Sequence, residues 1–425
     1  MGMQPAELER FEACEHEDLA DNVKLHFYGR GCHPDSTNAN VRPLNFIKVK
    51  LHGHNTRSGF PLTFGQISAL AGDFYGIPGQ PITLVGEIEL GQITDARKNR
   101  AIAAFNTLGE WKVEDFKKIK NTLLKNLEFI NGERATIEKD GKKKSTDTYG
   151  IIAYHGFEDA IYDDYKANSN KHLFGYSISD PKHALHLKAQ LENNYDHFQP
   201  YAKVTYEVFH VLALEEARKA REGHLTPNDK NEILESAYAL EAFGCHFLGD
   251  SFASGHMRTP RRELPKSTFG ETNGNILVNM MHNEDNEHGL RVTSKKAQQE
   301  GVAYWNAYGD AMLHHTKSSK NFKFAQRAVQ LGVDEVFRAS QRGETEMRIS
   351  DSEVFDFIPY IDPNEKNNTP MFQIINKNVC RRKELQDLQC KQRPIDNWSA
   401  VGTLSQLSWY KPQNGVIQKE TKTDK

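Results

Sequence analysis

The chain has 425 residues, of which 38% are hydrophobic and 26% charged, and its formal net charge is −3. This composition is typical of a globular protein, and the near-neutral charge argues against nucleic acid as a partner. No apolar run approaches the ~20 residues that span a bilayer, so no transmembrane segment is expected. The five cysteines are sparse and odd in number, which favours reduced thiols over a disulfide framework.

Residues 1–92 are predicted to form an irregular opening region. The first residues, MGMQPAELERFEACEHEDLA, are acidic where a signal peptide would be basic and then apolar. We therefore expect no N-terminal signal peptide, and either a cytoplasmic protein or export by a leaderless route, as for a translocated bacterial effector. Short β-like runs at 44–51 and 82–90 are interrupted by glycine and proline.

Residues 93–345 are predicted to form a helical core. Helical patterns cover 95–109 and 113–130, and long helices are expected through most of 181–342. Thr226 and Pro227 have the pattern of an N-cap and a first-turn proline, for a helix running to about Phe252. Beyond Gly343 the runs are shorter and richer in proline and asparagine, which predicts a C-terminal β-rich appendage, 346–425.

The strongest chemical signal is the string YALEAFGCHFLGDSFASGHMRTPRREL. His246 and Asp250 are four residues apart, so they lie on one face of the predicted helix and can reach one cation. His256 follows beyond Gly255, where the helix is expected to end. An isolated histidine with an acid four residues later is more often an exposed ion pair. Here the flanking residues are apolar, and a buried histidine and aspartate without partners would be costly.

A second predicted helical segment, VNMMHNEDNEHG, offers further ligands. His282 is followed by Asp285 and Asn286, three and four residues later, so either can share a metal ion with it. The basic run after the first motif contributes Arg258 and Arg261, whose guanidinium groups suit a substrate phosphate. For each arginine, a solvated basic turn is an equally good interpretation.

These motifs resemble a known family. The pattern H-x3-D-x5-H with a later histidine is that of the zinc-dependent bacterial phospholipases C and of the single-strand-specific nucleases of fungi and plants. The strings HFLGDSFASGHMRTPRR, NYDHFQPY, HNEDN and ALAGDFYG look like those of the zinc metallophospholipases C described in Pseudomonas and Legionella. The resemblance covers roughly residues 60–75 and 190–312.

The resemblance implies a mainly α fold, with a helical catalytic domain like those of phospholipase C and the single-strand nucleases. It also implies two or three zinc ions, and hydrolysis at a membrane surface of glycerophospholipids such as phosphatidylcholine to diacylglycerol and a phosphorylated head group. Asp250 would act in catalysis as well as metal binding. The implied metal ligands are His246, Asp250, His256 and His282, together with Asp73 of ALAGDFYG, also a general base, and His197 of NYDHF.

The chain departs from the family pattern in two places. It begins Met1-Gly2, whereas the distant relatives begin with a tryptophan whose amino group binds metal; His54, or else His33 or His26, would supply the replacement. Asn286 stands where the wider family has an acid. Asp285 beside it would serve instead, because zinc prefers a carboxylate to a neutral amide.

Three other functions compete with the phospholipase interpretation. A metal-dependent single-strand nuclease or phosphodiesterase would use the same ligands, and a non-catalytic lipid-binding module would keep only the scaffold. Gly249-Asp250-Ser251 also resembles the signature of a class of serine esterases, but that signature places its serine on a turn after a strand, and the preceding residues here are predicted to be helical.

The C-terminal appendage is rich in aromatic residues. They either dock on membranes or form its small core: Phe355, Phe357, Tyr360, Trp398, Trp409 and Tyr410.

Overall fold

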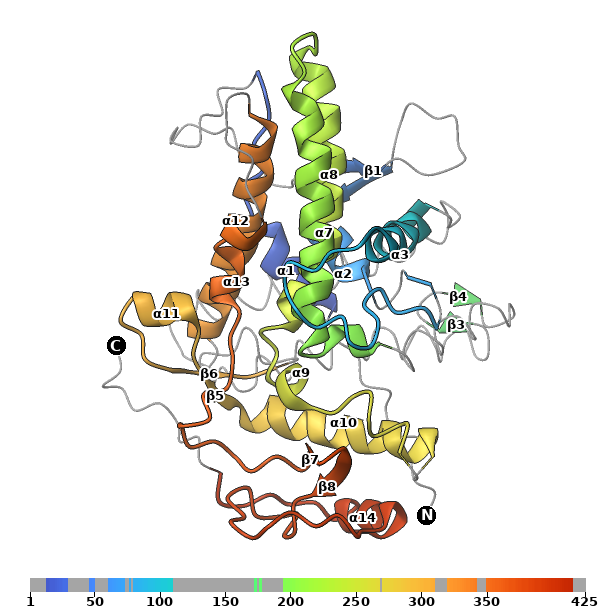
Figure 1. Ribbon diagram of the computed structural model, residues 1–425, viewed down its shortest axis with the longest axis vertical. Helices are drawn as coiled ribbons and strands as arrows, with labels where there is room; N and C mark the ends of the chain where they lie inside the picture. The colour runs from blue at the N-terminus through green and yellow to red at the C-terminus, as the bar shows by residue number, and fades with distance from the viewer. Residues whose placement is uncertain are drawn as a thin grey trace, which may run out of the picture.

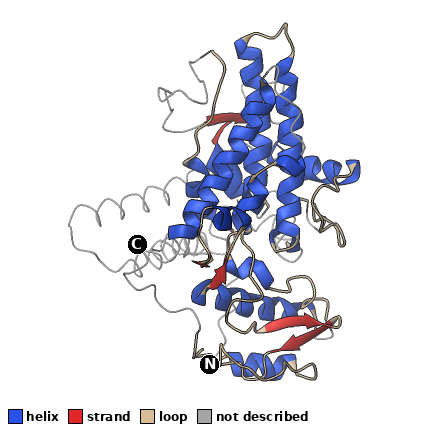
Figure 2. Cartoon of the chain, turned by 60° about the vertical axis from the view of Figure 1, so that its left-hand side comes forward, coloured by secondary structure: helices blue, strands red, loops and turns tan. Residues whose placement is uncertain are grey.

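The structure is a computed structural model. It describes residues 13–29, 46–49, 60–72, 76–77, 79–109, 172–173, 176–177, 194–267, 270–309, 319–341 and 349–415. The predicted helix at 113–130 lies outside these ranges. The described chain is mainly helical, as predicted, and its few strands form two-stranded antiparallel sheets (Figure 2).

Three long helices, α7 (Tyr201–Arg218), α8 (Pro227–Asp250) and α12 (Ser319–Ser340), pack against one another and form the upper part of Figure 1. A single turn of 3₁₀ helix, η3 (Lys219–Arg221), follows α7 before the chain reverses into α8. The start of α8 is the predicted one: Thr226 caps the helix and exchanges hydrogen bonds with Asp229 in a capping box. The predicted end near Phe252 is confirmed within two residues.

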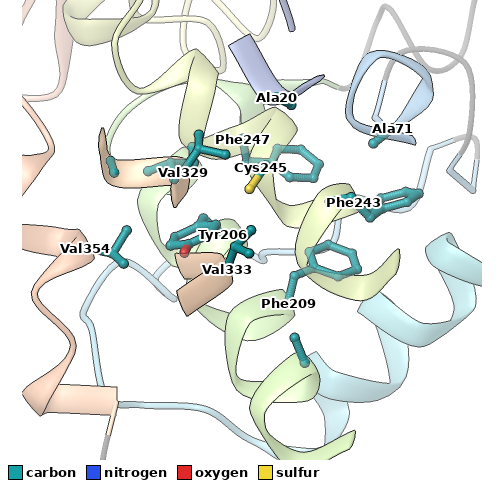
Figure 3. Packing of buried hydrophobic residues seen from close by; sticks show 14 of the residues in the cluster. Ala20, Ala71, Tyr206, Phe209, Phe243, Cys245, Phe247, Val329, Val333 and Val354 are labelled. Atoms are coloured by element: carbon teal, nitrogen blue, oxygen red, sulfur yellow. The ribbon is translucent and has the colours of Figure 1, made fainter. Parts of the chain in front are cut away.

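The main core lies between these helices (Figure 3). Phe209 of α7 packs on Phe243 of α8, with ring centroids 4.8 Å apart, and Val329 and Val333 of α12 lie in the same cluster. The second half of α8 has apolar residues on nearly all sides, and other helices bury it on nearly all sides. Burial of its polar side chains follows from that position.

The N-terminal elements cover the C-terminal half of α8. Helix α1 (Ala13–Asp21) packs on α2 (Phe64–Leu70), and both contact α8. Strands β1 (Phe46–Val49) and β2 (Phe60–Thr63) pair antiparallel just before α2. The predicted helix at 95–109 is present as α3 (Asp95–Asn106), extended by η1 (Thr107–Gly109), and it packs on α7. Strands β3 (His172–Leu173) and β4 (Tyr176–Ser177) form a further short hairpin.

The predicted strand at 82–90 is wrong. These residues form turns and bends, because Gly86 and Gly91 adopt positive φ angles of 93° and 81° that interrupt an extended backbone. The loop instead returns toward the 3₁₀ turn η2 (Tyr195–His197), where the backbone N–H of Ile82 donates to Asp196.

A second layer lies below the long helices in Figure 1. The short helix α9 (Ser254–Arg258) contacts α10 (Glu271–His288), which ends at Gly289 with φ 73°. The hairpin β5 (Leu290–Val292) and β6 (Trp305–Ala307) follows, with α11 (Lys295–Gln299) between its strands. The short helix α13 (Val354–Phe357), preceded by the 3₁₀ turn η5 (Ile349–Asp351), packs on α11 and α12.

The C-terminal segment contains less strand than expected. Its described part has one hairpin, β7 (Phe372–Ile375) and β8 (Asn378–Arg381), and the helix α14 (Ala400–Leu407); turns occupy most of the rest. The segment shares a small apolar core with α10, in which Phe372 packs near Met281. A buried ion pair of 2.6 Å between Arg382 and Glu284 of α10 strengthens this contact.

Candidate metal centre

The last turn of α8 carries the first two residues of the centre. His246 and Asp250 are both fully buried, and Nε2 of His246 lies 3.6 Å from Oδ2 of Asp250. The i, i+4 spacing therefore brings them together, as the sequence predicted. After Asp250 the helix ends, and the chain turns through 251–253 into α9.

Two further histidines face the same carboxylate. Oδ1 of Asp250 lies 3.3 Å from Nε2 of His16, and Oδ2 lies 2.9 Å from Nδ1 of His197. His16 stacks on His246 with ring centroids 4.2 Å apart, and Nε2 of His246 is 3.0 Å from Nδ1 of His197. One carboxylate thus has imidazoles on both of its oxygens. His16, His246 and Asp250 each offer a ligand atom within 4.8 Å of the others.

Hydrogen bonds on the outer side fix the tautomers of two rings. Nδ1 of His246 lies 2.9 Å from the carbonyl oxygen of Ser68, and Nδ1 of His256 lies 2.9 Å from that of His197. A carbonyl only accepts, so each Nδ1 carries the hydrogen and each Nε2 keeps its lone pair. A backbone carbonyl behind the ring is the usual support of a metal-binding histidine.

Burial keeps His246, His16 and His197 neutral. It lowers the pKa of His246 from its ordinary 6.5 to about 3, with the hydrogen bond to Ser68 opposing the shift. Burial also lowers the pKa of His16 and His197 well below 6.5, and the neighbouring imidazole of His246 adds to both effects. Neutral imidazole is the form that binds a metal ion.

Two glycines allow the rings to pack this closely. A Cβ on Gly72, which has φ 72°, would lie 2.5 Å from Cε1 of His197, and a Cβ on Gly249 would lie 2.7 Å from Nδ1 of His16. Gly72 belongs to the string ALAGDFYG of the resemblance. Residues 69–72, the first half of that string, therefore end beside the candidate metal centre.

His256 and His282 form a neighbouring pair. Their ring centroids are 4.9 Å apart, and Nδ2 of Asn286 lies 3.3 Å from Nε2 of His282. Oδ1 of Asn286 accepts from the backbone N–H of Gly255 at 2.6 Å, so this side chain joins α9 to α10. All three were candidate ligands in the sequence, and the backbone oxygen of His197 connects His256 to the first cluster.

Asp285 and Arg258 face each other instead of the histidines. Nε and Nη2 of Arg258 donate to the two carboxylate oxygens of Asp285 at 2.9 and 2.6 Å, and Nη1 donates to the carbonyl of Asn368. This arrangement is a correction to two expectations: Asp285 as a metal ligand and Arg258 as a phosphate clamp. A buried carboxylate needs a paired cation, and the last residue of α9 supplies one.

Arg261 is also directed into the protein. Its Nε donates to Asn194 at 2.8 Å and its Nη1 to Asn275 at 2.7 Å, so it holds the segment before η2 against α10. Its expected role as a phosphate ligand is not supported by these contacts. Arg261 instead helps to place η2, which carries His197.

Asp73, His54 and His33 lie outside the described residues. The third candidate to replace the family's N-terminal ligand, His26, lies 3.3 Å from Asp334 of α12 and belongs to another part of the fold. The sequence interpretation missed His16 of α1, whose Nε2 lies 3.3 Å from Oδ1 of Asp250. A signal was present: His16, Leu19, Ala20 and Val23 have the spacing of one buried helical face.

The donor set fits a divalent transition metal. Neutral imidazole nitrogens and a carboxylate oxygen, buried together, are the ligands that zinc takes in proteins. His16, His246 and Asp250 could hold one ion, with His197 beside them. A pocket on this side of the centre is lined by Gly72, Ile82, Asn194, Asp196 and His197.

No family model, curated protein or solved structure matches the chain. The family resemblance therefore depends on the quoted motifs and on the side chains that surround Asp250. Among the described residues, none of the helices has the length and apolar character needed to cross a membrane.

Proposed function

We propose that this protein is a zinc-dependent phospholipase C, which hydrolyses glycerophospholipids such as phosphatidylcholine to diacylglycerol and a phosphorylated head group. The observation that carries the proposal is the buried carboxylate of Asp250 between neutral imidazoles. The residues that resemble the family's ligands also converge, since His197, His246 and His256 lie within one connected group. Both observations support a hydrolytic metal centre.

The ligands of the proposed centre are this chain's own. His16, His246 and Asp250 would hold one zinc ion, and His197, whose Nδ1 lies 2.9 Å from Oδ2 of Asp250, would contribute to a second. His256 and His282 would contribute to the further ions that the resemblance implies. Bound zinc supplies Lewis acidity for phosphate oxygens and lowers the pKa of water. Asp73 is proposed from the resemblance as the general base.

The residues around the centre give the remaining functions. The carbonyl oxygens of Ser68 and His197 orient His246 and His256 through their Nδ1 hydrogens. The pocket beside His197 is the proposed route for the phosphate ester, because His197 itself lines it together with Gly72. Complete burial of Asp250 excludes bulk water from its carboxylate.

The contacts of Ser251 argue against the serine-esterase alternative. Its side chain is buried, and its hydroxyl donates to the carbonyl of Phe247 at 3.0 Å within the same helix. A nucleophilic serine would need an exposed hydroxyl with a histidine base next to it. Ser251→Ala is therefore expected to retain the activity.

The test combines metal analysis with product analysis on the purified full-length chain. Zinc-loaded protein should release phosphocholine and diacylglycerol from phosphatidylcholine, chelation should abolish the release, and added zinc should restore it. Free fatty acid, phosphatidic acid, or nucleotides from single-stranded DNA as the main product of the zinc-loaded protein would overturn the proposal. A purified chain that binds no zinc would overturn it as well.

A further inference from the structure

Exposed apolar side chains gather in one part of the described chain. Of the large hydrophobic side chains that are exposed in the described chain, four lie close together in the loop before α3. We call them the apolar surface: Leu84 at 43%, Val85 at 50%, Ile88 at 38% and Leu90 at 41% exposed. Ile102 is on α3, and the other four belong to the C-terminal segment: Tyr360, Ile374, Val401 and Trp409. A concentration of this kind marks an interaction site more often than scattered residues do.

The loop that carries these residues is held firmly. The backbone N–H of Ile82 donates to Asp196 at 2.9 Å, and its carbonyl accepts from Arg100 at 2.8 Å. The hydroxyls of Thr83 and Thr205 are 2.7 Å apart, and the N–H of Gly91 donates to a buried glutamate of α7 at 2.5 Å. Both ends of the loop are thus anchored, so its apolar tip is displayed on a fixed backbone.

The same loop forms a wall of the pocket beside the candidate metal centre. Gln80, Pro81 and Ile82 line that pocket together with His197. Asp196, which holds the loop through Ile82, is the residue directly before His197. Whatever binds at the apolar surface is therefore close to the route to the centre.

The charge of the loop selects among partners. Between residues 79 and 96 the sequence has three acidic residues and no lysine or arginine. Glu87 is paired with Arg100 at 2.6 Å, whereas Glu89 and Asp95 are exposed. Anionic membranes attract basic segments, and this segment offers none. An apolar tip with acidic flanks suits a bilayer of zwitterionic lipid.

We propose that the apolar surface inserts into the head-group layer of a zwitterionic phospholipid bilayer and so presents a lipid head group to the pocket at His197. This inference rests on the proposed function, because it supplies the substrate interface of the same centre. The surface acts in docking, and the residues around Asp250 act in hydrolysis. The two can therefore be tested separately.

The experiment compares full-length chains that carry serine in place of exposed apolar residues. The first variant is Leu84→Ser with Val85→Ser, and the second is Ile88→Ser with Leu90→Ser, so that a folding defect in one leaves the other informative. Val401→Ser is the matched control, because Val401 is 70% exposed but lies on α14 of the C-terminal segment. Binding is measured by sedimentation with phosphatidylcholine vesicles in the presence of chelator, where hydrolysis does not interfere.

Each double variant should bind the vesicles about tenfold or more weakly than the wild type, since apolar area no longer enters the interface. With zinc, the ratio of the rate on vesicles to the rate on dissolved short-chain phosphatidylcholine should fall by a similar factor. Val401→Ser should match the wild type in both measurements. Adding phosphatidylserine to the vesicles should not strengthen binding.

The two proposals fail in different ways. Docking is overturned if the double variants and the wild type sediment equally with vesicles, or if binding requires phosphatidylserine. It is also overturned if the double variants change only self-association, which would assign the surface to a second copy of the chain. If zinc-loaded wild type leaves dissolved phosphatidylcholine intact, the proposed function fails, and the sedimentation result still decides the docking.

Discussion

Helix α8 carries two buried clusters of histidine and carboxylate that differ in chemistry. At its C-terminal end, Asp250 is surrounded by imidazoles in the candidate metal centre. Near its middle, Glu241 lies 2.7 Å from Nδ1 of His210 on α7, and Nε2 of that ring lies 2.9 Å from Glu335 on α12. We call His210, Glu241 and Glu335 the ionic network. All three are almost completely buried.

The ionic network is closed. Burial alone would lower the pKa of His210, but Glu241 and Glu335 raise it to about 10, so the ring is a charged imidazolium with both hydrogens used. Glu241 also accepts from the hydroxyl of Tyr206 at 2.8 Å, and Glu335 from that of Ser352 at 2.7 Å. The ring of His210 therefore has no lone pair to offer a metal ion.

The difference comes from the ratio of imidazoles to carboxylates. One imidazole between two carboxylates gains a proton and forms ion pairs, because two negative charges outweigh the cost of burial. Several imidazoles around one carboxylate stay neutral, since burial opposes the charge of all three rings and the imidazole of His246 also opposes that of His16 and His197. Neutral rings offer lone pairs, so the second arrangement suits a metal ion and the first holds three helices together.

The largest effect is expected when the single carboxylate of the candidate metal centre is removed. Asp250→Asn should lower zinc affinity by more than about 100-fold, because even residues behind the ligands contribute 10- to 100-fold. Phospholipid hydrolysis should be lost with it. Competition with a chromogenic chelator measures the affinity, and elemental analysis the zinc content.

Glu335→Gln is the control for that experiment. Like Asp250→Asn, it replaces one oxygen of a buried carboxylate by an amide nitrogen, but in the ionic network. It should retain the zinc content of the wild type. Equal zinc affinity in Asp250→Asn and the wild type would show that Asp250 is not a ligand. The distinction between the two clusters would then fail.

Removing the cation of the ionic network should be the next largest change. His210→Ala leaves Glu241 and Glu335 in the core without a counter-charge, and breaking a buried ion pair in this way costs about 3 to 5 kcal/mol. Urea unfolding of the zinc-free chain would show the loss. Tyr206→Phe, which removes one hydrogen bond to Glu241, should cost only about 1 kcal/mol. A His210→Ala chain as stable as Tyr206→Phe would contradict the assignment.

The sequence predicted those features of α8 and of the candidate metal centre that depend on local spacing. The limits of α8 and the shared face of His246 and Asp250 follow from a capping pattern and from helical periodicity. The apolar residues at 82–90 suggested a strand, but this segment is a loop because two glycines with positive φ interrupt the extended backbone. Local patterns were sufficient where one element determines the geometry.

Pairings between distant elements were less accessible. His16 reaches Asp250 because α1 packs on α8, and no spacing rule connects residues that far apart. Asp285 has the correct spacing for a partner of His282, but its carboxylate instead accepts hydrogen bonds from Arg258, the last residue of α9. The ionic network was missed for the same reason, since its members come from three helices.

The two clusters should respond to pH with opposite signs. His246 has a folded pKa of about 3, below its ordinary 6.5, so the unfolded chain binds more protons and stability falls as pH falls through this window. His210 has a folded pKa of about 10, so its contribution is present below 6.5 and is lost as pH rises toward 10. Each group contributes a slope of at most about 1.4 kcal/mol per pH unit.

Urea midpoints of the chelated protein across pH would measure these slopes. His246→Gln should flatten the acidic side of the profile and leave the alkaline side as it is in the wild type. His210→Gln should flatten the alkaline side. Lysines and tyrosines also titrate there, but they are common to both proteins, so their contribution cancels when the variant's profile is subtracted from that of the wild type. Parallel profiles for both variants and the wild type would mean that the clusters do not differ in protonation.

The smallest effect is expected from the far end of α8. Thr226→Ala removes the capping box with Asp229 and should cost about 1 kcal/mol in urea unfolding, while Thr226→Ser should keep the cap. Both clusters lie more than three turns away, so neither zinc content nor the alkaline slope should change. Because α8 connects the two clusters, this variant tests whether each is set by its own neighbours. Loss of zinc in Thr226→Ala, at a stability cost of only about 1 kcal/mol, would mean that the candidate metal centre depends on the whole helix and not on the side chains around Asp250.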